Sequence, residues 1–221
     1  MGKGRIVVTG AAGTLGRAVA ERLHRAGWEV VAVDLAPAAD LPGCAAAAVG
    51  GVDLTDEAAV ARAFADLGPL AGLVNVAGGF AWEKVAEGGG ETWDRLFAIN
   101  VKTALNACRA ALPSLSAGGV IVNIGAAAAG KAEIGMAAYA ASKSGVARLT
   151  ESLAAELRPR GIRVNAVLPS IIDTPANRAD MPNADFTNWV TADELAHVIA
   201  FLLSAEASGV TGAAIPVIGR V

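Results

Sequence analysis

The first 34 residues constrain the fold more than any other part of the chain. A short β-branched run, Arg5–Thr9, leads into a turn in which three glycines are spaced as GxxGxxG. A helical pattern over residues 15–25 follows, and a second apolar run, residues 29–34, ends in the acid Asp34. A strand, a glycine turn, a helix and a second strand with a terminal acid, in this order, predict a βαβ unit that binds a dinucleotide.

The glycine turn predicts where the phosphates of that dinucleotide would lie. Residues without side chains let backbone N–H groups and a helix N-terminus approach a pyrophosphate closely. We expect this part of the site to consist of Gly10, Gly13, Thr14, Leu15 and Gly16.

Asp34 predicts which dinucleotide is preferred. A carboxylate at this position can accept hydrogen bonds from the adenosine ribose hydroxyls, and it repels a 2′-phosphate. No arginine directly follows it. We therefore expect NAD(H) rather than NADP(H) as the cofactor.

The rest of the chain repeats the alternation of strands and helices. We expect strands at residues 71–76, 120–124, 163–168 and 214–218, and helices at residues 55–67, 91–115, 137–157 and 192–204. Thr55 is the expected N-cap of the helix over residues 55–67. Regular alternation predicts one open, mostly parallel sheet with helices on both faces. The expected fold class is therefore α/β, a single doubly wound (Rossmann-type) domain over residues 1–221.

Tyr139 and Lys143 are the candidate reactive pair. They stand four residues apart on the predicted helix over residues 137–157, so their side chains share one face. A free tyrosine hydroxyl has a pKa of about 10, and a nearby ammonium favours the phenolate and lowers that pKa. The spacing also occurs on ordinary surface helices. However, ligands of parallel sheets bind beyond the carboxyl ends of the strands, and the pair is predicted at that edge together with Asp34 and Asn75.

Charge and composition argue against several other classes of protein. The formal net charge is −3, with acidic and basic residues interspersed, which argues against nucleic-acid binding. The two cysteines, Cys44 and Cys108, form no CxxC, and no histidine cluster is present, so we expect neither a disulfide framework nor a metal site. No apolar run reaches the length of a membrane span. We expect an unprocessed cytoplasmic protein that acts on a small molecule.

These motifs resemble those of the short-chain dehydrogenase/reductase family over nearly the whole chain. The segments that carry the resemblance are TGAAGTLG at residues 9–16, Asp34, Asp53-Leu54, NVAG at residues 75–78, Asn100, YAASK at residues 139–143 and LPSIIDT at residues 168–174. The glycine spacing departs from the GxxxGxG of the common subgroup, a change that a backbone-lined turn tolerates.

The resemblance implies a role for each matching residue. Tyr139 would exchange a proton with the substrate, Lys143 would bind the nicotinamide ribose and tune Tyr139, and Asn100 would support a proton relay through water. The residues that it places along the cofactor are Asp53, Leu54, Asn75, Ala77, Gly78, Tyr139, Lys143, Pro169, Ile172 and Thr174. It also makes residues 169–190 the substrate lid.

One departure from the family pattern bears on the chemistry. Ala126 stands where the family has a catalytic serine, and no serine or threonine occurs between Ala117 and Ala138. Loss of one hydrogen-bond donor to a developing oxyanion costs roughly 10²–10³ in rate. An ordinary ketone reductase would therefore be impaired by this residue.

A subgroup that lacks this serine offers a specific interpretation. Dihydropteridine reductases resemble the family, keep the tyrosine–lysine pair and lack the serine. Residues 76–82 (VAGGFAW) and 168–189 of this chain resemble the corresponding segments of those enzymes. The resemblance implies an NADH-dependent reductase of a flat, activated substrate such as a quinonoid dihydropteridine. Two alternatives remain: a carbonyl or 3-oxoacyl-thioester reductase or alcohol dehydrogenase, and a catalytically weak NADH-binding scaffold.

Four aromatic residues near these motifs have two interpretations each. Phe80 and Trp82 either stack on a flat heterocycle or close the edge of the core. Phe186 and Trp189 are expected to pack within the lid rather than to contact substrate.

The chain is expected to self-associate. The predicted helices over residues 91–115 and 137–157 carry small apolar residues that a monomer would leave partly bare. In the family such helices pack across subunits, so we expect a homodimer or a homotetramer.

Overall fold

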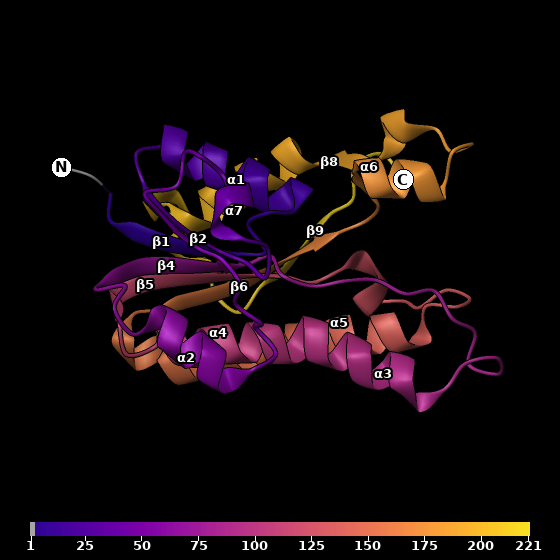
Figure 1. Cartoon of the computed structure of the whole chain (residues 1–221), viewed down its shortest axis with the longest axis horizontal. Helices are drawn as coiled ribbons and strands as arrows, with labels where there is room; N and C mark the ends of the chain where they lie inside the picture. The colour runs from indigo at the N-terminus through magenta and orange to yellow at the C-terminus, as the bar shows by residue number, and fades with distance from the viewer. Residues whose placement is uncertain (1–2) are drawn as a thin grey trace.

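A seven-stranded parallel sheet organises the chain, and the computed structural model describes it over residues 3–221 (Figure 1). The strand order is β3-β2-β1-β4-β5-β6-β9, and every neighbouring pair is parallel. The strands are β1 (Arg5–Thr9), β2 (Glu29–Val33), β3 (Ala47–Val49), β4 (Leu70–Asn75), β5 (Leu115–Ile124), β6 (Arg163–Pro169) and β9 (Ala214–Val217). The expected Rossmann-type sheet is confirmed.

Helices cover both faces of the sheet, as Figure 1 shows. One face carries α1 (Thr14–Arg25) and α7 (Ala192–Leu203), and the other carries α2 (Glu57–Phe64), α3 (Gly90–Phe97), α4 (Thr103–Ala111) and α5 (Ala137–Leu157). Successive side chains of a strand point to opposite faces. Ile6 and Val8 of β1 accordingly belong to the core under α1 and α7, whereas Val7 belongs to the core on the other face.

The strand order reverses at β1, and this places the site. β1 pairs with β2 on one side and with β4 on the other. At such a switch point a crevice opens outside the carboxyl ends of the strands. Thr9 and Asn75 end β1 and β4 in register, so the glycine turn and the loop after β4 begin side by side.

The predicted helix over residues 91–115 is wrong in its extent. The segment consists of α3, a π-helical stretch (Ala98–Lys102) and α4, and Leu115 already begins β5. The backbone N–H of Leu70 donates to the Ser114 carbonyl at 2.8 Å, and Leu70 and Leu115 are partners in the sheet. Sheet pairing therefore ends the helical region early, which helical periodicity alone does not reveal.

Two smaller differences concern β3 and the start of α2. The edge strand β3 was not expected, because its alanine-rich sequence shows no alternation of apolar and polar residues. The N-cap of α2 is Asp56 rather than Thr55, since the Asp56 carboxylate accepts from the Ala58 N–H at 2.9 Å.

The segment over residues 169–190, for which the sequence predicts no helix or strand, contains short regular elements. Strands β7 (Ile172–Asp173) and β8 (Val190–Thr191) pair in parallel at its base, and α6 (Pro175–Asp180) lies between them. The Thr174 hydroxyl caps α6 by accepting from the Asn177 N–H at 3.1 Å. Within residues 3–221, no helix combines the length and apolarity needed to cross a membrane.

Candidate active site

The glycine turn forms a cradle of backbone N–H groups at the start of α1. Gly10 has φ +66°, and a Cβ there would lie 2.6 Å from the Ala77 nitrogen. Gly13 is the N-cap of α1. Among the described residues, no side chain caps the N-terminus of this helix, and its first turn contains no acidic residue. Gly13 and Thr14 are exposed, whereas Leu15 is buried. The open helix N-terminus therefore fits a pyrophosphate, with Leu15 contributing only its backbone.

Asp34 lies beside this cradle and is bonded to it. Its carboxylate accepts from the backbone N–H of Ala12 and of Ala36, each at 2.9 Å. A carboxylate offers about four lone-pair sites, so acceptor capacity for ribose hydroxyls remains. Arg17 was missed from the sequence: its Nε donates to the Ala12 carbonyl at 2.9 Å, and its guanidinium also reaches the Asp40 carbonyl. Arg17 precedes Asp34 in the chain, whereas the expectation from the sequence concerned only an arginine directly following Asp34.

Asp53 and Leu54 lie in the loop between β3 and α2. The exposed Asp53 carboxylate accepts from the Thr55 hydroxyl at 2.7 Å and from its N–H at 2.8 Å, and these bonds lower the pKa of Asp53. Leu54 is buried, and its carbonyl accepts from Asn106 Nδ2 at 3.0 Å. Asn106 of α4 was not singled out from the sequence, because only the tertiary fold brings it under this loop.

Asn75 lies in a buried polar network rather than in an open position. Its Nδ2 donates to Asn123 Oδ1 at 2.9 Å, and its Oδ1 accepts from the Thr9 hydroxyl at 3.4 Å. Asn123 Nδ2 in turn donates to the Thr150 hydroxyl of α5 at 2.9 Å. These side chains join the ends of β1, β4 and β5 to α5. The side chain of Asn75 is therefore fully engaged within the protein, and it is not free to contact a cofactor.

Asn100 ties the loop after β4 to α5. Its Oδ1 accepts from the Gly79 N–H at 2.9 Å, and its Nδ2 donates to the Gly79 carbonyl at 3.1 Å and to Ser142 Oγ at 3.0 Å. Ser142 donates to the Tyr139 carbonyl at 2.7 Å. Both hydrogens of the Asn100 amide are thus used, so its side chain serves positioning. A π-helical segment often marks a functional site, and Asn100 lies within one.

Lys143 lies close to the same loop and is buried. Its Nζ donates to the Ile124 carbonyl at 2.8 Å, and a Cβ added at Gly78 would lie 3.3 Å from that Nζ. Burial lowers the pKa of Lys143 to about 8. A side chain at Gly78 would also come within 2.6 Å of Asn100 Oδ1, so glycine is required where the loop passes both residues.

Tyr139 is half-buried, and its ring meets Phe80 edge-to-face with the centroids 4.9 Å apart. Burial raises the pKa of Tyr139 to about 12. The expectation that Lys143 lowers this pKa is therefore corrected here: desolvation sets the pKa of the phenol, and the lysine ammonium is directed to the Ile124 carbonyl. At neutral pH the group is a protonated donor.

The alanine at position 126 has no hydroxyl stand-in among the nearby serines. Ala126 is buried in extended backbone (φ −158°) just before a 3₁₀ turn, Ala127–Ala129. Ser142 Oγ is engaged with Asn100 and Tyr139, and Ser144 Oγ donates to the Ala129 carbonyl at 2.9 Å. The alanine-rich loop is therefore held in place by Ser144 without presenting a donor of its own.

The remaining predicted contacts lie at the base of the segment over residues 169–190, the predicted lid. Pro169 is buried at the end of β6, while Ile172 and Thr174 are half-buried. The Thr174 hydroxyl is occupied as an acceptor by the α6 cap and keeps its own hydrogen for donation. Phe186 and Trp189 pack together with centroids 4.8 Å apart, and Trp189 is only 3% exposed, which agrees with packing inside the lid.

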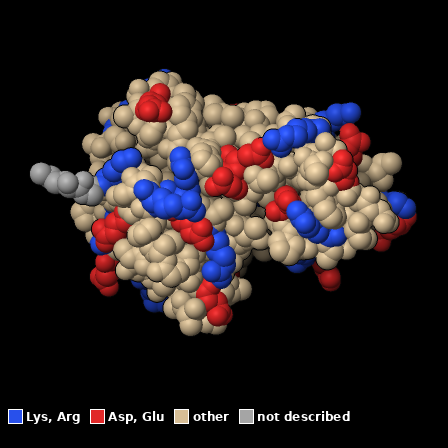
Figure 2. All heavy atoms as spheres, turned by 90° about the horizontal axis from the view of Figure 1, so that it is seen from above, with Lys and Arg blue, Asp and Glu red and all other residues tan. Residues whose placement is uncertain are grey.

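The distribution of charged side chains on the surface does not indicate a particular class of ligand. Basic and acidic residues are intermingled on the face that carries α1 and the lid (Figure 2). Residues 3–221 contain no group of three or more histidine, cysteine or acidic side chains arranged to hold a metal ion.

The fold and the site together define a dinucleotide-binding α/β oxidoreductase with a tyrosine–lysine pair. A family model described as enoyl-(acyl carrier protein) reductase matches residues 10–219. The chain is 34% identical over 241 residues to 2-(S)-hydroxypropyl-CoM dehydrogenase 3 from Xanthobacter autotrophicus, covering 97% of this chain and 94% of that protein. The chain belongs to the short-chain dehydrogenase/reductase family.

Two further relatives show how varied this family is. Inactive 2-(S)-hydroxypropyl-CoM dehydrogenase 2 from Xanthobacter autotrophicus is 37% identical over 220 residues, covering 88% of this chain and 95% of that protein. The chain also resembles the crystal structure of a blue fluorescent protein from a metagenomic library in complex with NADPH. The two chains share 29% sequence identity, the TM-score is 0.88, and the match covers 99% of this chain and 98% of that one. Family membership therefore leaves the substrate and the choice between NAD(H) and NADP(H) open.

Proposed function

We propose that this protein is an NADH-dependent reductase of a flat, activated, conjugated substrate such as a quinonoid dihydropteridine. The observation that carries the proposal is that the chain keeps the Tyr139–Lys143 pair but has the buried Ala126 at the position of the family's serine. Reduction of an isolated ketone places negative charge on one oxygen, which a hydroxyl donor would stabilise. A conjugated imine-type substrate spreads that charge and depends less on such a donor.

The surroundings of Tyr139 support a planar substrate. Phe80 packs its ring against Tyr139 and remains 52% exposed, so one side of it is free to contact a ligand. Trp82 is 54% exposed on the same loop. Aromatic surfaces of this kind bind flat heterocycles by stacking or edge contacts. An apolar wall next to the proton donor thus takes the place of the missing polar group.

The chain's own residues supply binding and the proton. The cradle of backbone N–H groups and Asp34 would hold the dinucleotide, and the Lys143 ammonium would bind its nicotinamide ribose. A reduced nicotinamide supplies the hydride when it is bound. Tyr139, kept protonated by its burial, would donate the proton, and Asn100 would hold the loop at Gly79 against α5. We propose that residues 169–190 close over the substrate.

The preference for NADH rests on Asp34. Its carboxylate is fixed by hydrogen bonds from the Ala12 and Ala36 N–H groups beside the glycine turn, and we propose that it accepts the ribose hydroxyls and repels a 2′-phosphate. Arg17 lies nearby but is held by the Ala12 and Asp40 carbonyls, and we propose that the Asp34 carboxylate, rather than this guanidinium, sets the preference. We also propose a cytoplasmic location, since both Cys44 and Cys108 are free thiols.

Two other functions have specific support. The name of the relative 2-(S)-hydroxypropyl-CoM dehydrogenase 3 favours an alcohol dehydrogenase or a carbonyl or 3-oxoacyl-thioester reductase. The inactive relative favours an NADH-binding scaffold without turnover. The lack of a hydroxyl at Ala126 is compatible with slow ketone reduction and with no reduction at all.

One assay separates these functions. NADH oxidation is followed with quinonoid dihydropterin, with a quinone panel and with ketones and acyl thioesters, beside binding titrations of NADH and NADPH. Turnover confined to the pterin supports the proposal, and efficient ketone turnover supports the dehydrogenase alternative. Tight NADH binding with no turnover supports the scaffold. Tyr139→Phe should lose most activity, and tighter binding of NADPH than of NADH would overturn the role of Asp34.

A further inference from the structure

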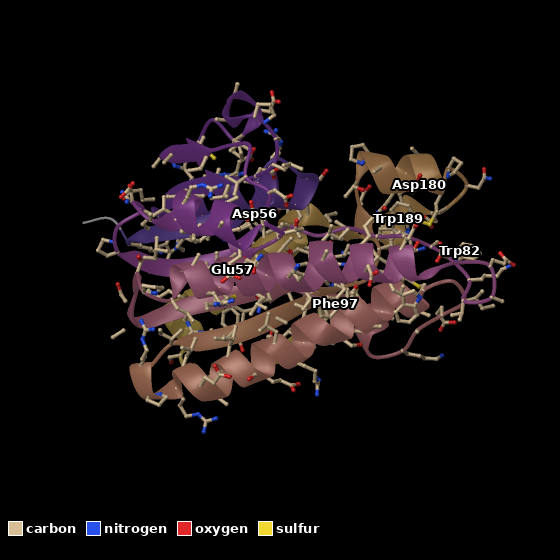
Figure 3. All side chains as sticks on the ribbon, turned by 60° about the horizontal axis from the view of Figure 1, so that its bottom comes forward. Asp56, Glu57, Trp82, Phe97, Asp180 and Trp189 are labelled. Atoms are coloured by element: carbon tan, nitrogen blue, oxygen red, sulfur yellow. The ribbon has the colours of Figure 1, made fainter. Side chains whose placement is uncertain are left out.

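Two loops from distant parts of the chain are joined next to Tyr139. The first, here called the β4 loop, spans residues 76–89. The second, the α5 approach, spans residues 130–136 and leads into α5. The backbone N–H of Glu83 donates to the Gly135 carbonyl at 2.8 Å, and the indole of Trp82 lies against Gly135. Figure 3 places Trp82 at the end of the molecule where the lid residues Trp189 and Asp180 also lie.

Gly135 is the position that allows this contact. Its φ is +76°, a conformation that side-chain-bearing residues rarely adopt. A Cβ at this position would overlap the indole of Trp82, with 2.6 Å to Cδ2 and still closer approaches to two other ring atoms. The tryptophan ring thus fills the space of a side chain at position 135. Because α5 begins at Ala137, the contact is made just ahead of the first turn, which carries Tyr139.

The β4 loop is itself anchored on both sides of Trp82. The Glu83 carboxylate accepts from the Thr92 hydroxyl of α3 at 2.8 Å. On the other side, the ring of Phe80 meets Tyr139 edge-to-face, a geometry that aromatic pairs prefer. Trp82 is therefore held between two fixed points, although 54% of its surface is exposed.

From these contacts we propose that Trp82 and Gly135 are a positioning pair, which holds the first turn of α5 and the ring of Phe80 so that the Tyr139 phenol keeps one orientation. Trp82 acts through Tyr139 and not as a group that receives or donates a proton. This inference depends on the proposed function in one respect, the role of Tyr139 as the proton donor. It deepens that function, because a fixed Phe80–Tyr139 wall selects a planar substrate.

The chain offers a direct probe of this pair. Tyr139 is the only tyrosine, so ring-¹³C tyrosine labelling gives one set of NMR signals from the site itself. Burial raises the pKa of this phenol to about 12, so at pH 10.5 it stays largely protonated in the wild type. A phenol released into solvent has a pKa of about 10 and would be largely ionised there.

We expect Trp82→Ala to move the tyrosine signals and to lower the Tyr139 pKa by one unit or more, towards about 10. Misplacement of a reacting group by about 1 Å costs up to 10²-fold, so kcat with the pterin should fall by roughly 10- to 100-fold while the Kd for NADH is unchanged. Gly135→Ala should act in the same way, and Trp82→Phe should restore most of the wild-type values.

Gly118→Ala is the matched control for Gly135→Ala. Gly118 has φ +78°, and a Cβ there would meet nothing within 4 Å, so the substitution introduces similar backbone strain without a contact to Trp82. It should leave the Tyr139 signals unchanged. Circular dichroism at each pH confirms that the variants are folded, and Trp82→Leu replaces Trp82→Ala if the latter does not fold.

The outcomes distinguish this inference from the proposed function. A folded Trp82→Ala or Trp82→Leu variant with wild-type tyrosine signals and pKa would overturn the positioning pair even if the pterin is a good substrate. Full activity of Tyr139→Phe would overturn the proposed function, while the NMR comparison would still report whether Trp82 orients the ring.

Discussion

Lys143 shows how one buried residue can link the site to the stability of the fold. The residue is 5% exposed, and its ammonium has one hydrogen bond, to the Ile124 carbonyl. Burial disfavours the charged form, and this lowers the pKa of Lys143 from 10.5 to about 8. The residue is therefore still mostly charged at neutral pH, as its proposed binding to the ribose requires, but it loses its charge over the weakly alkaline range.

This shift predicts a pH dependence of stability. Between pH 8 and 10.5 the unfolded chain binds more protons at Lys143 than the folded chain, so the free energy of unfolding rises with pH across this window. Relative to Lys143→Met, the wild type should gain on the order of 2–3 kcal/mol between pH 8 and 10. Urea unfolding of both cofactor-free proteins at several pH values measures the difference. A difference that does not change with pH would contradict the assigned shift.

Ala126 is the residue whose replacement should alter substrate choice. Ala126→Ser restores a hydroxyl at the family's position, and one such donor contributes roughly 10²–10³ in rate. We expect turnover of simple ketones to rise by about 10²-fold, with a much smaller change for the pterin. Ala127→Ser, one position along, is the control and should leave ketone turnover unchanged. Equal ketone rates in both serine variants would remove Ala126 as the determinant.

Replacement of Asp34 should change the preference between NADH and NADPH. Asp34→Ser removes the carboxylate that is bonded to the Ala12 and Ala36 N–H groups, while Arg17 stays nearby through the Ala12 carbonyl. The ratio of the Kd values for NADPH and NADH should fall by at least about tenfold, because a charge repulsion of about 1.4 kcal/mol is removed. Fluorescence titration with both cofactors tests this. Asp40→Ser, also near Arg17, should leave the ratio unchanged.

The sequence identifies single residues of the site that belong to a local pattern. It misses those that only the tertiary fold brings close to the site. Tyr139 with Lys143 and the glycine turn follow from spacing along one helix or one turn. Asn106 reaches its loop from α4, and the guanidinium of Arg17 reaches the Asp40 carbonyl from α1. No spacing in the sequence marks such contacts, because they depend on how separate elements pack.

The strand ends and α5 are held together by buried polar side chains. Thr9, Asn75, Asn123 and Thr150 form a chain of hydrogen bonds that runs from β1 through β4 and β5 to α5. This chain aligns the glycine turn with the helix that carries Tyr139. Buried polar groups of this kind stabilise a structure only when every member is bonded.

Removing the centre of this chain should destabilise the protein. Asn123→Ala takes the acceptor from Asn75 Nδ2 and the donor from the Thr150 hydroxyl, and each unsatisfied buried group costs about 1–3 kcal/mol. We expect the free energy of unfolding to fall by about 3 kcal/mol. Urea unfolding followed by circular dichroism measures it. Ser152→Ala, which removes an exposed hydroxyl, is the control and should change stability by less than about 0.5 kcal/mol.

The sequence predicts an element well where a helical pattern extends over many turns. It fails where pairing between distant strands determines the structure. The helix over residues 137–157 is confirmed in full as α5, since its pattern extends over many turns. The sequence predicts Leu115 as the end of a helix and no element over residues 116–119, yet all of these residues belong to β5, where Leu115 pairs with Leu70. The β7–β8 pair at the base of the lid likewise depends on residues far apart in the chain.

The whole molecule consists of a sheet between two helical layers, and one layer exposes large apolar residues. On α3, Trp93 is 41% exposed and Phe97 is 52% exposed. The two lie four residues apart and so share one face of the helix. α3 packs along α5, and Figure 3 shows Phe97 on the outward side of this helical layer. Adjacent exposed aromatic residues on one helical layer are typical of a surface that another subunit covers.

This arrangement predicts self-association through α3 and α5. We expect size-exclusion light scattering at micromolar concentration to give the mass of a dimer or a tetramer. Phe97→Asp places a charge in the contact and should reduce the mass at least twofold, because an unpaired buried charge costs several kcal/mol at an interface. Val85→Asp is the control: Val85 is 70% exposed on the β4 loop, and the charge there should leave the mass unchanged. A wild-type monomer, or a Phe97→Asp variant of unchanged mass, would show that this face does not form the contact.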